Sequence, residues 1–138
     1  MSATPLQPEQ ALPGQGECVL FLDDEEPLVQ LASRMLARMG YRVVAFTRAS
    51  EALEAFRSEP GRFDVVLTDL SMPGASGMDF ARSVLEIRPD IPVILATGHI
   101  APPDLQRARH IGVREVILKP STIEDMSRAF RRVLSGVC

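Results

Sequence analysis

The sequence predicts an α/β fold in which five parallel strands form one doubly wound sheet with helices on both faces. The first observation behind this prediction is a short apolar run, typical of a strand buried on both faces, which recurs five times after residue 17. The second is that an amphipathic helical pattern follows each run, and the third is that the connections are short and contain Pro, Gly and capping residues. Strict alternation of strand and helix favours right-handed crossovers and the flavodoxin-like strand order 2-1-3-4-5.

The N-terminal segment differs from the rest of the chain. Residues 1–16 are rich in Pro, Gln and Gly and show no hydrophobic period, so we expect a disordered tail or linker there. Residues 17–138 are expected to form one domain, because a chain of 138 residues with 46% hydrophobic and 24% charged content suits a single globular unit.

Composition argues against several classes of protein. A formal net charge of -3 disfavours a nucleic-acid partner bound through a basic surface. No apolar stretch approaches the ~20 residues needed to span a bilayer, and no secretory signal is evident, so we expect a cytoplasmic domain without membrane contact. Cys18 and Cys138 are expected to be free thiols.

The first strand and helix have well-marked boundaries. The apolar run Cys18–Leu22 predicts a buried strand, and Glu25-Glu26-Pro27 predicts a helix start, since acidic residues and Pro suit a first helical turn. Gly40 is expected to end this helix. Its predicted core stripe consists of Leu28, Leu31, Ala32, Met35, Leu36 and Met39.

The middle of the chain continues the alternation. Residues 41–46 predict the second strand, and Thr47 or Ser50 is expected to cap a helix that ends before Pro60. The third strand is predicted over residues 63–68.

A sharp loop and a third helix follow that strand. Met72-Pro73-Gly74 and Gly77 predict the loop, because Pro and Gly favour turns. The apolar residues Met78, Ala81, Val84 and Leu85 mark the helix, which is expected to end near Arg88-Pro89.

Two further strands and two helices complete the pattern. The strands are predicted over residues 91–96 and 113–118. Pro102-Pro103 can lie only before or at the start of a helix, so the fourth helix is expected over roughly residues 104–110. Ser121-x-x-Glu124 has the pattern of a capping box and predicts the start of the last helix.

Polar residues stand where four of these strands end. Asp23-Asp24 follow the first strand, Asp69 the third, Thr97 the fourth and Lys119 the fifth. Because the carboxyl ends of parallel strands meet at one edge of a sheet, we expect these side chains to share one pocket, with the acids in the crevice between the first and third strands. Each residue alone also has an ordinary explanation, such as a helix-start acid, a turn residue or a solvated strand end.

Three carboxylates in one pocket repel one another. Two unit charges ~4 Å apart cost ~4 kcal/mol at an effective dielectric near 20. We therefore expect a compensating cation, and Mg²⁺ (or Mn²⁺) is the natural choice because it prefers carboxylate oxygens and bridges to phosphate. The expected ligands are Asp23, Asp24, Asp69 and the backbone carbonyl of Ser71.

This set of residues suits phosphoryl transfer onto a carboxylate. The transition state spreads negative charge over the phosphoryl oxygens, so catalysis consists mostly of positioning and charge neutralisation. Asp69 is the expected nucleophile because it lies centrally between the other acids and the two remaining strand ends. The metal, Lys119 and the Thr97 hydroxyl are each expected to contact one phosphoryl oxygen.

The same residues resemble the receiver domain of bacterial two-component response regulators. The resemblance rests on Leu22-Asp23-Asp24-Glu25, Thr68-Asp69-x-x-Met72-Pro73-Gly74, Ala96-Thr97-Gly98 and Lys119-Pro120, and it covers residues 17–135. It implies that Asp69 is the phosphoacceptor, that Asp23, Asp24 and the Ser71 carbonyl bind Mg²⁺, and that Thr97 and Lys119 contact the phosphate. It further implies a cis peptide bond between Lys119 and Pro120.

The resemblance also implies a partner and a context. The phosphoryl donor is expected to be a histidine kinase or a histidine phosphotransfer protein, and His99 and His110 of this chain are not expected to serve as donors. We expect either a single-domain regulator or the terminal receiver of a hybrid histidine kinase. Val116 departs from the family pattern, which usually has Tyr or Phe three residues before the lysine. Strong phosphorylation-driven dimerisation is therefore not expected.

Three other functions are compatible with parts of this pattern. A flavodoxin-like flavin binder shares the topology, but its first loop is rich in Ser, Thr or Gly, whereas residues 23–26 here are all acidic. A haloacid-dehalogenase-type phosphatase forms aspartyl phosphate, but it uses Asp-x-Asp after its first strand, whereas this chain has Asp23-Asp24-Glu25 there. A degenerate receiver that acts only as a protein-interaction module usually lacks an acid or the lysine, and none is missing here.

Overall fold

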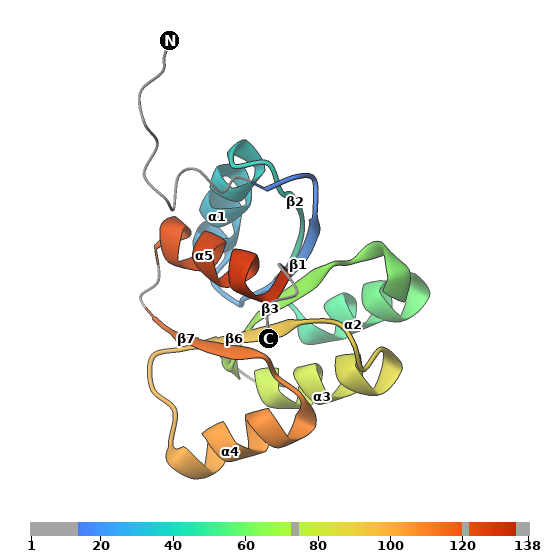
Figure 1. Cartoon of the computed structure of the whole chain (residues 1–138), viewed down its shortest axis with the longest axis vertical. Helices are drawn as coiled ribbons and strands as arrows, with labels where there is room; N and C mark the ends of the chain where they lie inside the picture. Colours follow the sequence, from blue (N-terminus) through green and yellow to red (C-terminus); the bar gives the residue numbers. More distant parts are fainter. Residues whose placement is uncertain (1–13, 73–74, 120–121, 135–138) are drawn as a thin grey trace.

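The computed structural model describes residues 14–72, 75–119 and 122–134, and within these residues its main feature is a five-stranded parallel sheet (Figure 1). The strands are β1 (Cys18–Leu22), β2 (Arg42–Phe46), β3 (Val65–Asp69), β6 (Val93–Thr97) and β7 (Glu115–Leu118). They lie in the order β2-β1-β3-β6-β7, and every neighbouring pair is parallel. Numbered along the chain, these strands have the order 2-1-3-4-5, which confirms the predicted doubly wound topology.

Helices cover both faces of the sheet, as expected. One face carries α1 (Glu26–Arg38) and α5 (Ile123–Leu134), and the other carries α2 (Ala49–Ser58), α3 (Gly77–Ile87) and α4 (Pro102–Ile111) (Figure 1). Two smaller elements connect the sheet to its helices. A 3-10 turn, η1 (Pro60–Arg62), precedes β3, and an antiparallel pair, β4 (Ser71–Met72) and β5 (Ala75–Ser76), precedes α3.

The strand β1 shows why the apolar runs of the central strands are nearly continuous. Successive side chains of a strand point to opposite faces, so Val19 and Phe21 of β1 pack under α1 and α5, whereas Leu20 and Leu22 pack under the other three helices. These four side chains are at most 2% exposed. Full burial of each contributes roughly 1.5–3 kcal/mol, so the sheet anchors the strand ends that carry the polar residues.

The core face of α1 differs from the predicted stripe. Val29, Ala32 and Leu36 are buried, but Leu31 and Met35 are 56% and 39% exposed. The prediction was wrong for Leu31 and Met35 because α1 has two apolar stripes at helical spacing, and the sheet covers only one of them.

Three helix starts also differ in detail from expectation. Arg48 is the N-cap of α2 without a side-chain cap bond, so neither Thr47 nor Ser50 has that role. The helix α4 begins at Pro102, two residues earlier than predicted, since Pro fits the first turn. At α5 the reciprocal cap joins Thr122 and Asp125: each backbone N–H donates to the other side chain, at 3.1 and 3.0 Å. Ser121, half of the predicted Ser121-x-x-Glu124 box, lies outside the described residues.

The packed part of the chain includes residues before Glu17. The backbone N–H groups of Gly14 and Gly16 donate to the carbonyls of Met39 and Gly40, at 2.6 and 2.7 Å. Two residues of the expected tail, Gly14 and Gly16, therefore bond to the residues that follow α1, while residues 1–13 lie outside the described part.

Two other expectations concern the membrane and the thiols. Within the described ranges, no helix has the length and apolar character needed to cross a bilayer. Cys18 is a buried free thiol, and burial raises its pKa above the ordinary value. Cys138 lies outside the described residues.

Candidate functional site

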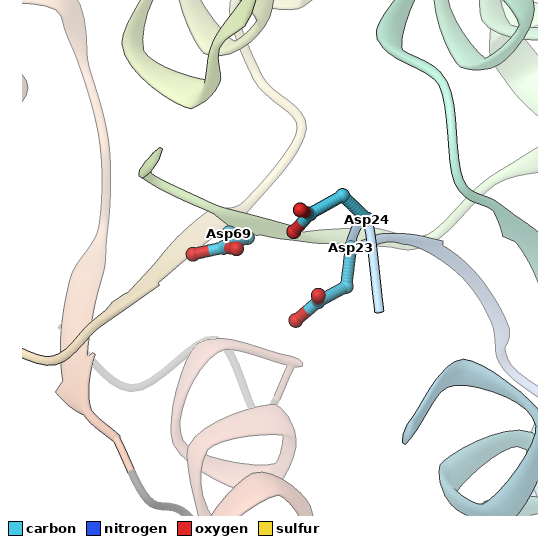
Figure 2. Close-up of side chains that lie close together, drawn as sticks. All are labelled: Asp23, Asp24 and Asp69. Carbon is cyan, nitrogen blue, oxygen red and sulfur yellow. The ribbon is translucent and has the colours of Figure 1, made fainter. Parts of the chain in front are cut away.

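The acids predicted to converge do so at the carboxyl edge of the sheet. Asp23 and Asp24 follow β1, and Asp69 is the last residue of the neighbouring strand β3. Carboxylate oxygens of the three residues lie within 4.8 Å of one another. Figure 2 shows the side chains of Asp23 and Asp24 extending from the end of one strand toward Asp69 on the next. Asp23 and Asp69 are only 1% and 6% exposed, whereas Asp24 is nearer the solvent.

The backbone fixes Asp23 more tightly than an ordinary loop residue. Its N–H donates to the Phe46 carbonyl at 3.2 Å, which extends the contact between β1 and β2 by one residue. Its Oδ1 accepts a hydrogen bond from the Glu25 N–H at 3.0 Å, so the carboxylate also stabilises the approach to α1. Asp23 is therefore held at the strand end by both its main chain and its side chain.

Lys119 lies among these carboxylates. Its Nζ is 2.9 Å from Asp23 Oδ2 and 3.4 Å from Asp69 Oδ2, and its side chain is 24% exposed. Burial alone would lower the pKa of the ammonium, but the hydrogen bonds and charges of Asp23 and Asp69 outweigh burial and raise that pKa above its ordinary value. Lys119 consequently stays protonated and supplies a positive charge to two nearly buried acids.

This arrangement corrects one step of the sequence argument. We expected the acid repulsion to require a metal ion, but the structure shows that an ammonium group of the chain already compensates part of it. A signal for this role was present in the sequence, because Lys119 is the only lysine among 15 basic Lys and Arg residues. All the other cationic side chains of this set are guanidinium groups, which are better suited to fixed bidentate pairing.

The acid cluster also fits a divalent cation. Mg²⁺ holds oxygen ligands at about 2.1 Å, which places neighbouring ligands about 3–4 Å apart. The observed separations of up to 4.8 Å require only small side-chain adjustments to reach that range. The donor set of carboxylates is the type that Mg²⁺ and Mn²⁺ prefer. Asp23, Asp24 and Asp69 would hold the ion, and Ser71, in β4 two residues beyond Asp69, is near in sequence.

Thr97 occupies the predicted position but has a local partner. It is the last residue of β6, 4% exposed, and its hydroxyl donates to the His99 carbonyl at 2.8 Å. The backbone N–H of Lys119 donates to the Thr97 carbonyl at 2.8 Å, so these two strand ends are joined directly. The structure thus brings Thr97 beside Lys119, with the hydroxyl engaged by the following loop.

The remaining predicted residues are placed as follows. Val116 lies in β7 and packs, partly buried, against the core between the sheet and α2, α3 and α4. His99 and His110 are exposed. Pro120, and with it the expected cis bond after Lys119, lies outside the described residues.

Comparison with known proteins agrees with this geometry. A family model described as the response regulator receiver domain matches residues 19–131. The two-component response regulator ARR10 of Arabidopsis thaliana is 31% identical over 86% of this chain and 21% of its own length. This chain spans only 15–24% of the length of this relative and three further curated relatives.

Solved structures give the same result. A response regulator receiver domain protein from Clostridium thermocellum has a TM-score of 0.81 and 33% identity, over 86% of this chain and 94% of that one. A response regulator from Burkholderia pseudomallei, solved with a phosphorylated aspartic acid, a calcium ion and citrate, has a TM-score of 0.77 and 25% identity, over 86% of this chain and 69% of that one. The chain therefore belongs to the response regulator receiver domain family, whose members are phosphoacceptor modules of two-component signalling.

Proposed function

We propose that Asp69 accepts a phosphoryl group from the phosphohistidine of a histidine kinase or a histidine phosphotransfer protein, with Mg²⁺ or Mn²⁺ as the cofactor. One observation carries the proposal. Asp69 stands at the end of a central strand with two further acids and the only lysine of the chain around its carboxylate. A cluster with this excess of negative charge is ready to take up a cation, and a cation is what an incoming phosphoryl group needs.

In this proposal the three acids divide into two roles. Asp23, Asp24 and the Ser71 carbonyl would hold the cation together with one oxygen of Asp69. The other oxygen of Asp69 attacks phosphorus, so an O–P bond forms as the N–P bond to the donor histidine breaks, and the donor ring, protonated on its other nitrogen, leaves as neutral imidazole. The cation neutralises charge on the phosphoryl oxygens when bound.

Two contacts in the structure must change when the phosphoryl group arrives. The Lys119 ammonium pairs with Asp23 and Asp69, and we infer that it shifts to a phosphoryl oxygen. The Thr97 hydroxyl donates to the His99 carbonyl, and we infer that it rotates to a second phosphoryl oxygen and releases that loop. Because both side chains gain their new contact only after transfer, they shift the conformational equilibrium of the domain.

The solved relatives support the same assignment. The Burkholderia pseudomallei protein contains a phosphorylated aspartic acid and a calcium ion, and its fold matches this chain. A degenerate receiver is disfavoured here, because the acids, the threonine and the lysine are all present and lie at one edge of the sheet. The domain acts on itself in this proposal, assisting its own phosphorylation and dephosphorylation, and is not an enzyme with a separate substrate.

We propose that phosphorylation produces only a modest conformational response. Val116 replaces the usual aromatic side chain, so the rearrangement of Thr97 has no aromatic ring at position 116 to move with it. We therefore propose phosphate acceptance or relay, for instance as the terminal receiver of a hybrid kinase, in preference to strong phosphorylation-driven dimerisation.

The test is labelling by a small acyl phosphate in the presence of Mg²⁺, followed by intact-mass measurement. The wild type is expected to gain one phosphoryl group and Asp69→Asn none. Asp64→Asn is the matched control, because Asp64 precedes β3 at the opposite end of the same strand. Labelling of Asp69→Asn to the wild-type extent, or its loss in Asp64→Asn alone, would refute the assignment.

A further inference from the structure

The first residue of α3 lies against the backbone of Asp69. A Cβ atom placed on Gly77 would be 1.9 Å from the Asp69 carbonyl oxygen and 2.8 Å from Leu70 Cα. Gly77 does not have a positive φ angle, so its backbone conformation is open to any residue. The sequence suggests a turn glycine here, but the structure shows that the requirement is for close approach of two backbone segments.

The sheet fixes one side of this contact. Asp69 pairs with Ala96 in the ladder between β3 and β6, and the Leu70 N–H donates to the Ala96 carbonyl at 2.9 Å. The Thr68 hydroxyl, fully buried, donates to the Asp69 carbonyl at 3.0 Å. The carbonyl that faces Gly77 is therefore held by a neighbouring side chain and by the strand itself.

The helix fixes the other side. The Gly77 N–H donates to the Leu70 carbonyl at 2.8 Å. The Ser76 hydroxyl caps α3 by accepting from the N–H groups of Met78 and Asp79, at 3.1 and 3.4 Å. The helix then inserts its apolar face into the core, where the buried residues are Met78, Phe80, Ala81, Val84 and Leu85. The start of α3 is thus anchored against the backbone of Asp69 and Leu70.

We propose that Gly77 is a positioning residue for Asp69: the absence of a side chain at Gly77 lets α3 set the place of the phosphoacceptor carboxylate. The inference rests on the proposed function of Asp69. Real Cβ atoms essentially never come within 3.0 Å of another heavy atom, so a methyl group at Gly77 requires the two segments to separate by about 1.1 Å, the difference between 3.0 and 1.9 Å. Misplacement of a reacting group by about 1 Å costs about 10²-fold in rate.

The separation is expected to fall on Asp69 and Leu70. Shifting α3 would disturb the apolar side chains that it buries in the core, and packed interiors resist such shifts. Asp69 is the last residue of β3, and the pairing with β6 continues beyond it through the hydrogen bond from the Leu70 N–H to the Ala96 carbonyl. The carboxylate of Asp69 consequently moves relative to Asp23, Asp24 and Lys119, which are held by other strands.

The test compares Gly77→Ala with Gly98→Ala. Gly98 follows Thr97 at the same edge of the sheet, but a Cβ there meets nothing within 4 Å. The initial rate of labelling by acyl phosphate is measured at saturating Mg²⁺ and divided by the folded fraction from circular dichroism, because a purely structural effect changes only the folded fraction. Gly77→Ala is expected to lose about 10²-fold in this corrected rate, whereas Gly98→Ala stays near wild type.

Each outcome separates the two proposals. Labelling of the wild type together with an unchanged corrected rate in Gly77→Ala overturns the positioning role alone. A wild type that takes no label refutes the proposed function, and the positioning role with it. Should Gly77→Ala not fold, Thr68→Val tests the same carbonyl from its other side, with Thr47→Val, a half-buried threonine after β2, as the control. A lower corrected rate in Thr68→Val supports the positioning of this carbonyl, and an unchanged one overturns it.

Discussion

The acidic side chains at the two ends of the parallel sheet differ in how completely they are paired. At the amino end, each acid that precedes or opens a strand has a partner: Glu17 pairs with Arg131 at 2.6 Å, Asp64 accepts from the Cys18 N–H at 2.7 Å, and Glu115 is bidentate to Arg132. At the carboxyl end, the acids following β1 and ending β3 are Asp23, Asp24 and Asp69, and Lys119 is the cation paired with two of them.

This difference shows which charges serve the fold and which serve the chemistry. An acid at a strand start that already has a partner stabilises the fold and attracts a further cation less strongly than an unneutralised cluster does. The carboxyl end keeps more negative than positive charge among its described residues, and this arrangement costs stability in the absence of a metal. A protein tolerates such a cost at a functional site, so we expect the two ends to respond differently to mutation, metal and pH.

The largest effect is expected for Lys119→Ala. Asp23 and Asp69 are at most 6% exposed, so removing their counter-charge leaves two nearly buried carboxylates in mutual repulsion. Without metal we expect a loss of about 3 kcal/mol in the free energy of unfolding, as for other broken buried pairs, and Mg²⁺ should restore part of it. Urea unfolding in a chelator and in Mg²⁺ measures both.

The control for that variant is Arg107→Ala, which breaks the exposed pair with Asp104. A surface change of this type is expected to alter the free energy of unfolding by no more than about 0.5 kcal/mol. A Lys119→Ala variant that behaves like this control would show that Lys119 does not compensate the buried acids.

A smaller effect, with a distinct pH dependence, is expected for the amino end. Burial would raise the pKa of Glu17, but hydrogen bonds from the Gln15 backbone and from Arg131 outweigh it and lower that pKa below its ordinary 4.5. The pair's contribution is therefore present above pH 4.5 and is lost as the pH falls through the lowered pKa. Glu17→Gln should cost about 1 kcal/mol at neutral pH and flatten the acid limb of the stability curve.

The stability contribution of the carboxyl end is expected to change with pH in the opposite direction. The pKa of Lys119 is raised above its ordinary 10.5, so its contribution is complete below that pH and is lost as the pH rises through the raised pKa. Denaturant unfolding across the pH range separates the two ends. If the loss of stability at alkaline pH is the same in Lys119→Ala as in the wild type, the role given to Lys119 is wrong. If the loss of stability at acid pH is the same in Glu17→Gln as in the wild type, the role given to Glu17 is wrong.

Thr97→Ala is expected to affect signalling more than chemistry. Its hydroxyl holds the His99 carbonyl before phosphorylation and is proposed to contact the phosphoryl group afterwards. We expect labelling to persist at a reduced rate, while the phosphorylation-induced change in amide chemical shifts over residues 98–104 is lost. Wild-type shift changes in phosphorylated Thr97→Ala would show that Thr97 does not couple the phosphate to this loop.

The smallest effect is expected for self-association. A population shift from 1:99 to 99:1 requires about 5.5 kcal/mol of differential binding, and Val116, already packed in the core, gains little by moving. Sedimentation velocity should therefore give similar sedimentation coefficients for the phosphorylated and the unphosphorylated domain. A complete monomer-to-dimer conversion at micromolar concentration would contradict this interpretation of Val116.

Much of the fold was predictable because its signals are local. The apolar runs of β1 and β3, buried on both faces, and the acids at their ends follow from period and position in the sequence. The burial of α1 was not fully predictable, since Leu31 and Val29 are both apolar and only tertiary packing decides which one faces the sheet. The N-terminus of α5 was also ambiguous, because Ser121-x-x-Glu124 and Thr122-x-x-Asp125 both fit the capping-box pattern. In the structure Thr122 and Asp125 form the reciprocal cap.

The site was predictable in composition but not in its contacts. Parallel topology brings the strand-end residues together, and this required only their order along the chain. The pairing of Lys119 with Asp23 and the engagement of Thr97 by His99 depend on side-chain geometry across the edge of the sheet. The contact between Gly77 and the Asp69 carbonyl depends on where α3 begins in space, which a glycine in a loop pattern does not reveal.

The most direct test of the central comparison is a Mg²⁺ titration followed by thermal melts of the wild type, Asp24→Asn and Glu17→Gln. If the carboxyl end is the end that takes a cation, Mg²⁺ should raise the melting temperature of the wild type and of Glu17→Gln by the same increment, because binding to the native state stabilises it by mass action. Asp24→Asn should lose most of that increment while melting no lower than the wild type without metal, since one repelling charge is gone. A wild type that does not respond to Mg²⁺, or an equal response in Asp24→Asn, would contradict the account.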